Sequence, residues 1–87
     1  MAQIDTNNFQ EKNKERNNIH EKVNSSYSFF EINGQKYFQI DMYGSSDRQI
    51  TDKVSQSIQI DKKVAEKIIE LLRKEFNIWV NKAKYDA

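Results

Sequence analysis

Residues 27–43 decide the fold, and their sequence is YSFFEINGQKYFQIDMY. Polar and apolar side chains alternate on both sides of a central Asn33-Gly34 pair. The central residues of a type I′ turn need a positive φ, which glycine adopts freely and asparagine tolerates. This stretch therefore predicts two antiparallel strands that are joined by a tight turn.

Residues 54–60 alternate in the same way and predict a further strand, after a polar segment that we expect to be a loop or an irregular continuation of the sheet. Asp61 then supplies a side chain that can cap a helix. Apolar residues follow at helical spacing in one stripe: Val64, Ala65, Ile68, Ile69, Leu72, Phe76 and Trp79. We expect an amphipathic helix from Asp61 to Trp79.

The predicted fold class is α+β, with a small curved antiparallel sheet of three to four strands followed by one C-terminal amphipathic helix. The chain has 87 residues, 37% of them hydrophobic, which suffices for one domain. A domain this small gains core by pairing with a second copy, so we expect a homodimer. Its interface is expected on the helix, at Ile69, Phe76 and Trp79.

Residues 1–24 are rich in Asn, Gln, Lys and Glu, and their few apolar residues form no stripe. We interpret them as a polar, disordered arm, with at most a frayed helix over residues 10–22, and residues 25–87 as the sheet and helix domain. The alternative is an arm that becomes ordered on a partner. No stretch has the features of a signal peptide or of a membrane-spanning helix, so we expect a cytoplasmic protein.

Catalytic chemistry finds little support in the composition. Cysteine is absent, and His20 is the only histidine. A Ser-His-Asp triad or a histidine metal cluster therefore cannot be expected in one chain. The only glycines, Gly34 and Gly44, are too few for a phosphate-binding glycine-rich loop. We predict a non-enzymatic protein with no metal and no cofactor, although the acidic residues Glu31, Asp41, Asp47 and Asp52 leave magnesium binding as a minor alternative.

Strand alternation assigns the side chains to two faces of the sheet. We predict that one face packs on the helix, with Phe30, Ile32, Phe38, Ile40, Met42, Ile58 and Ile60. The other face is predicted to carry Tyr27, Phe29, Glu31, Tyr37, Gln39, Asp41, Tyr43, Ser55, Ser57 and Gln59. Such aromatic and polar side chains are typical of a binding surface.

This second face could bind nucleic acid, because aromatic rings stack on nucleobases and polar side chains bond base edges or phosphates. The predicted nucleic-acid-binding residues are Phe29, Lys36, Tyr37, Gln39, Tyr43, Arg48 and Lys53. Two alternatives remain open. The aromatic residues could serve sheet stability alone, or the face could bind a protein or a second subunit. The net charge of +1 requires any nucleic-acid site to be local.

The order of these features resembles the positive-cofactor-four family of transcriptional coactivators. The resemblance covers residues 36–43, the loop with Asp47 and Arg48, residues 53–61 and the helix to Trp79. It implies a dimer whose helices pack together and whose curved sheets bind single-stranded or unwound DNA with little sequence preference. Tyr37, Gln39 and Tyr43 would then lie on the DNA-facing strand, with Arg48 and Lys53 in the basic turn. The chain departs from the family in being less basic.

Residues 43–59 also resemble small bacterial proteins, some of them encoded near mobile elements and defence genes. This similarity adds an alternative function. The chain could be a phage or mobile-element protein that binds and inhibits, or regulates, a nucleic-acid-targeting defence enzyme.

Overall fold

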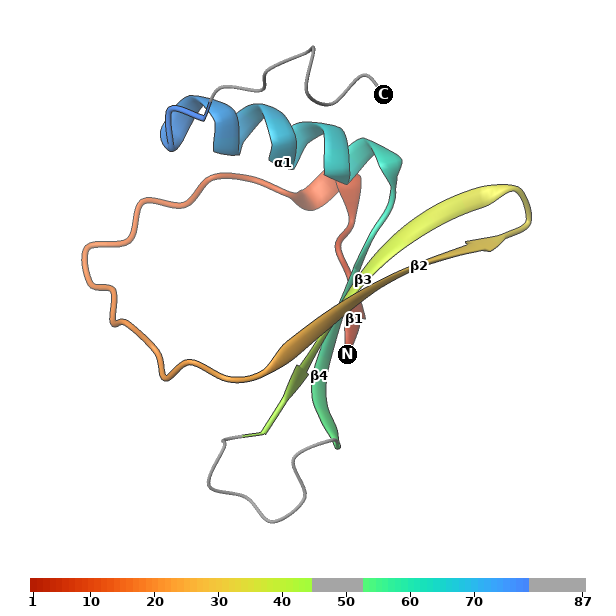
Figure 1. The fold of residues 1–87 in the computed structure, drawn as a ribbon. Coiled ribbons are helices and arrows are strands. Elements are labelled where there is room, and N and C mark those ends of the chain that lie inside the picture. Colours follow the sequence, from red (N-terminus) through yellow and green to blue (C-terminus); the bar gives the residue numbers. More distant parts are fainter. Residues whose placement is uncertain (45–52, 79–87) are drawn as a thin grey trace.

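A computed structural model describes residues 1–44 and 53–78 and shows an α+β architecture, with a four-stranded sheet followed by one helix (Figure 1). The strand order is β1-β4-β3-β2, antiparallel throughout except for the parallel pair of β1 and β4. The elements in chain order are β1 (Ala2–Gln3), the 3-10 helix η1 (Thr6–Asn8), β2 (Ser25–Ile32), β3 (Gln35–Tyr43), β4 (Val54–Ile60) and α1 (Lys62–Glu75).

The β2–β3 hairpin forms as its sequence predicts. Asn33 and Gly34 have φ values of 53° and 78°, so both occupy the left-handed region that a type I′ turn requires. Ile32 pairs with Gln35 directly across this turn. The β3–β4 pairing is regular from Phe38 to Met42 and then shifts register at Tyr43.

The hairpin register corrects the predicted faces of β2. A two-residue turn places each even-numbered residue of β2 opposite an odd-numbered residue of β3, so Phe29 pairs with Phe38 and Phe30 with Tyr37. Directly opposed residues share a face. The prediction was therefore wrong for five β2 side chains. Phe30 and Ile32 lie on the face of Tyr37 and Gln39. Tyr27, Phe29 and Glu31 lie on the face of Phe38 and Ile40.

We call the two surfaces the aromatic face and the polar face. The aromatic face carries Tyr27, Phe29, Glu31, Lys36, Phe38, Ile40, Met42, Ile58 and Ile60. The polar face carries Phe30, Ile32, Tyr37, Gln39, Asp41, Tyr43, Ser57 and Gln59.

Helix α1 begins at the predicted cap and ends earlier than predicted. The Asp61 carboxylate accepts a hydrogen bond from the Val64 amide over 2.9 Å. At the other end Asn77 has a φ of 55°, and the Ile78 amide donates to the Arg73 carbonyl over 3.1 Å. This left-handed residue and six-to-one bond form a Schellman-type stop, so the helix ends at Glu75.

The helix covers little of the sheet. Within the described residues Val64 is the one apolar side chain that is fully buried, at 1% exposure, and α1 contacts the sheet mainly through β4. Farther along the stripe, Ile69 is 57% exposed and Phe76 is 70% exposed. The helix stripe therefore leaves an apolar surface in solvent, although burial of such residues is favourable by about 1.5–3 kcal/mol each.

The beginning of the polar segment is structured, in contrast to the expectation of a disordered arm. Ala2 and Gln3 pair with Ile58 and Gln59 of β4, and the Ile4 amide donates to the Gln59 carbonyl over 2.9 Å. Residues 9–24 form no helix or strand and connect η1 to β2 in an open course (Figure 1). No described helix has the length and apolar character needed to cross a membrane.

Candidate nucleic-acid interface

The polar face is tied together by a chain of side-chain hydrogen bonds between β3 and β4. Gln59 Nε2 donates to Gln39 Oε1 over 2.8 Å, and Gln39 Nε2 donates to Asp41 Oδ1 over the same distance. Ser57 Oγ donates to Asp41 as well. These contacts follow from the register, because Gln39 is opposite Gln59 and Asp41 is opposite Ser57. The hydrogen bonds from Ser57 and then Gln39 lower the pKa of Asp41, so this carboxylate is charged at neutral pH.

The aromatic residues of the polar face are also engaged within the chain. Phe30 stacks on Tyr37 with ring centroids 5.3 Å apart and an interplanar angle of 21°. The Tyr37 hydroxyl donates to Gln35 Oε1 over 3.1 Å, and the Tyr43 hydroxyl is 2.8 Å from Ser26 Oγ. The polar face thus combines a central negative charge with polar groups that already bond one another. Both features disfavour a phosphate backbone on this surface.

The residues predicted to bind nucleic acid are divided between the two faces. Tyr37, Gln39 and Tyr43 lie on the polar face, whereas Phe29 and Lys36 lie on the aromatic face. Of the predicted cations near the loop, Lys53 is exposed and directly precedes β4. Among the dimer residues, Ile69 is exposed on α1 and Phe76 is exposed at the C-cap of this helix. Arg48 and Trp79 lie outside the described residues.

Three aromatic rings gather on the aromatic face. Phe29 and Phe38 have ring centroids 5.0 Å apart, and Tyr27 is 6.2 Å from Phe29 and 5.9 Å from Phe38. Tyr27 is 72% exposed and Phe29 is 62% exposed, so two of the three rings remain open to solvent. Exposed rings in mutual contact are held in place and still present free π-surfaces for stacking.

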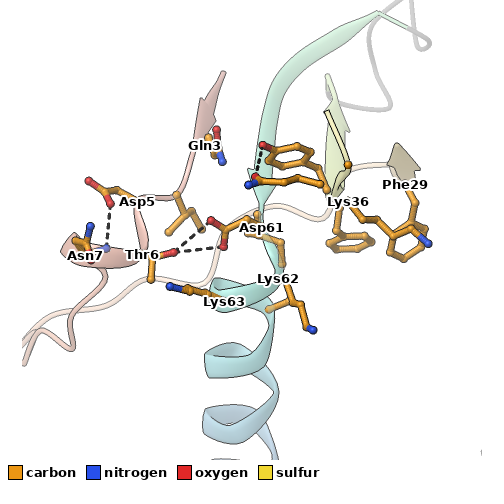
Figure 2. Close-up of a pocket in the computed structure, with 16 residues that line it drawn as sticks. Gln3, Asp5, Thr6, Asn7, Phe29, Lys36, Asp61, Lys62 and Lys63 are labelled. Atoms are coloured by element: carbon orange, nitrogen blue, oxygen red, sulfur yellow. Dashed lines mark hydrogen bonds between the residues drawn. The ribbon is translucent and has the colours of Figure 1, made fainter. Parts of the chain in front are cut away.

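This cluster adjoins a cleft of about 990 Å³ between the turn end of the β2–β3 hairpin, the start of α1 and the η1 segment (Figure 2). Lys36 extends beside Phe29 on the hairpin side, and Lys62 and Lys63 project from the first turn of α1. We call this site the aromatic–lysine cleft. Its hairpin and helix sides are lined by Phe29, Lys36, Phe38, Lys62 and Lys63.

The N-terminal segment forms the opposite wall of the aromatic–lysine cleft. Thr6 Oγ1 lies 3.3 Å from both carboxylate oxygens of Asp61, which joins η1 to the helix cap. Asp5 accepts from the Asn7 amide and from Asn8 Nδ2, each over 2.9 Å. The bonds from Asn8 and then Asn7 lower the pKa of Asp5, so a second fixed negative charge borders the cleft.

A further contact fastens this wall to the middle of α1. Lys67 Nζ donates to the Phe9 carbonyl over 2.9 Å and lies 5.6 Å from the centroid of the Phe9 ring. Sequence reasoning missed the wall and the two helix lysines, because the polar composition of residues 1–24 outweighed the short Asp5-x-Asn7 capping signal.

The lysines of the aromatic–lysine cleft are available to a ligand, because the nearby carboxylates bond other groups. The Asp61 carboxylate accepts hydrogen bonds from the Val64 amide and from Thr6, and the Asp5 carboxylate accepts one from the Asn7 amide. In the part of the chain that the structure describes, Lys36, Lys62 and Lys63 form no ion pair with a carboxylate, even though Glu31 is the cross-strand neighbour of Lys36. A multivalent anion with planar groups could therefore use both the lysines and the rings.

The described residues contain no group of three or more His, Asp or Glu side chains that could hold a metal ion. Comparisons with models of protein families, with curated proteins and with solved structures find no match for this chain. The function is therefore inferred from the surfaces described above.

Proposed function

We propose that this chain is a non-enzymatic protein that binds single-stranded or unwound nucleic acid with little sequence preference in the aromatic–lysine cleft. The observation that carries the proposal is the exposed Phe29 ring beside Lys36, with Lys62 and Lys63 across the cleft. Stacking rings combined with a cationic groove are the usual means of binding single strands without reading their sequence. Such a ligand implies action inside the cell.

The lysines favour nucleic acid over a protein ligand at this particular site. Lysine is depleted in the cores of protein–protein interfaces, whereas aromatic residues are common in both kinds of interface. The aromatic–lysine cleft combines three exposed lysines with rings that have open faces. This location replaces the polar face as the proposed site, because the polar face is centred on the Asp41 carboxylate.

The helix stripe supports a homodimer as part of the same proposal. Ile69 and Leu72 are exposed on α1, and Phe76 is exposed at its C-cap. Burial of such a stripe against a second copy would supply core that the single chain lacks. The same exposed stripe also favours the second candidate function, a regulator that binds and inhibits another protein. In that case the helix would dock into an apolar groove of the target.

Fluorescence anisotropy with a labelled oligothymidine of about 20 nucleotides tests the proposed ligand class. Binding should weaken as salt rises, with a slope of log K against log salt of about −2 if three lysines contact phosphates of a single strand. A duplex of the same length should bind more weakly, because its bases are not free to stack on the rings. Absence of binding to single strands at low salt would refute the proposal.

A further inference from the structure

Strand β2 forms a long bare edge of the sheet. It spans eight residues, Ser25–Ile32, and its only described strand neighbour is β3. Its sequence, SSYSFFEI, contains no proline and no lysine, and Glu31 is its single charged residue. Natural proteins usually protect an edge strand with such residues, with a bulge or with a covering segment.

The opposite edge of the sheet shows such protection. There β1 covers Ile58 and Gln59 of β4, and the β3–β4 register shifts at Met42/Tyr43. The contrast between the two edges indicates that the β2 edge is left open for pairing.

The hairpin register identifies which backbone groups point outward from this edge. The Tyr43 amide donates to the Asn24 carbonyl over 2.9 Å, and Ile32 pairs with Gln35 next to the two-residue turn. Even-numbered positions from 24 to 32 therefore form the hydrogen-bonded pairs with β3. The amides and carbonyls of the odd-numbered residues Ser25, Tyr27, Phe29 and Glu31 then point away from β3.

We propose that the β2 edge pairs antiparallel with the β2 edge of a second copy of this chain, about a two-fold axis at Ser28. This register places Tyr27 opposite Phe29 of the second copy and Ser25 opposite Glu31 of the second copy. It is the register that brings all four outward-pointing residues of each strand into hydrogen-bonded pairs. It also avoids placing like charges opposite each other, since Glu31 faces a serine.

The same register keeps matching faces of the two sheets on one side. Residues of equal parity pair across the two-fold axis, so the aromatic face of one copy continues into the aromatic face of the other. The clusters of Tyr27, Phe29 and Phe38 would then adjoin across the axis and form one continuous stacking surface. This consequence rests on the proposed nucleic-acid function, whereas the pairing itself does not.

Light scattering on the full chain without oligonucleotide tests the pairing. The variant Ser25→Pro/Glu31→Pro removes two outward amides and leaves the β2–β3 hydrogen bonds in place, because proline is tolerated where an edge N–H faces solvent. The matched control Ser25→Ala/Glu31→Ala removes the same side chains and keeps the amides. The proline variant should have half the molar mass of the wild type at micromolar concentration, and the alanine control should keep the wild-type mass.

Hydrogen exchange on the wild-type chain gives a second readout that does not depend on the folding of the proline variant. The amides of Tyr27 and Phe29 should be protected, and this protection should rise with protein concentration. A monomeric wild type would overturn the proposal, as would a folded proline variant of unchanged mass. Rapid exchange at Tyr27 and Phe29 beside a protected Phe30 amide would overturn it too. A helix-stripe dimer alone would give these last two results, so the two interfaces are distinguishable.

Discussion

Phe29 lies directly opposite Phe38 across the β2–β3 ladder, with ring centroids 5.0 Å apart and an interplanar angle of 41°. The next residue, Phe30, stacks on Tyr37 on the other side of the sheet. The two consecutive phenylalanines therefore lie on opposite faces of the sheet. The same substitution at each of them can show which face binds the ligand.

We expect Phe29→Leu to weaken binding of a single-stranded oligonucleotide in anisotropy titrations. Loss of one stacked base costs about 1–3 kcal/mol, which corresponds to a roughly 5- to 150-fold rise in Kd. Phe30→Leu is the control, because it makes the same chemical change on the polar face and should leave Kd within about twofold. A larger effect for Phe30→Leu would move the site to the face of Tyr37 and Tyr43.

The helix lysines should determine the salt dependence of this binding. Replacement of Lys62 and Lys63 by glutamine should reduce the slope of log K against log salt by about 0.7 for each phosphate contact that is lost. Lys12→Gln/Lys14→Gln makes the same change of net charge in the exposed segment before β2. Equal slope changes in the two double variants would show that net charge alone, and not the aromatic–lysine cleft, drives binding.

The hairpin shows what the sequence could and could not predict. Asn33-Gly34 correctly predicted the turn, and the capping residue Asp61 correctly predicted the start of α1. Because Phe29 and Phe30 are consecutive and both apolar, alternation alone did not show which of the two rings faces the helix. The two-residue turn contained the missing information, because it pairs residues of opposite parity and so fixes which face each phenylalanine occupies.

Other features depend on contacts that local patterns do not report. The parallel pairing of Ala2 with Ile58 joins residues far apart in the sequence, and two residues are too few to show alternation. The helix end was missed because the apolar spacing continues past Phe76, whereas Asn77 adopts the left-handed conformation that stops the helix. The aromatic–lysine cleft was missed because one of its walls is the N-terminal segment, which is far in the sequence from the hairpin and the helix that form the other sides.

We expect Gly34→Ala to destabilise the chain by about 1–2 kcal/mol, through backbone strain alone. Gly34 has a φ of 78°, and a Cβ atom added there would meet nothing within 4 Å. Urea denaturation followed by circular dichroism measures the change, with Asn33→Asp as a control that keeps a side chain tolerant of positive φ. A loss that is far larger than this would indicate that the turn contacts another surface in the native protein.

Asp41 should make stability depend on pH in the acidic range. Its pKa in the folded chain is lowered by the hydrogen bonds from Ser57 and Gln39. Its contribution is therefore present above the unfolded pKa of about 3.9 and is lost as pH falls through the lower folded value. Thermal melting should show a smaller drop in Tm between pH 6 and pH 2 for Asp41→Asn than for the wild type. Parallel curves for the two proteins would contradict this assignment.

Asp5 should oppose the binding of an anionic ligand, although it belongs to the same site as the lysines. Its carboxylate lines the aromatic–lysine cleft and is kept charged by Asn8 and Asn7, so it repels a phosphate that approaches Lys62 and Lys63. Asp5→Asn removes this charge, and its amide oxygen can still accept a hydrogen bond from the Asn7 amide. The affinity for a single-stranded oligonucleotide should rise roughly two- to fivefold at low salt, the size expected for a charge pair in water.

The control variant Asp41→Asn makes the same change on the polar face and should leave the affinity unaltered. Equal gains for both variants would reflect net charge alone, and no gain for Asp5→Asn would place the ligand outside the aromatic–lysine cleft.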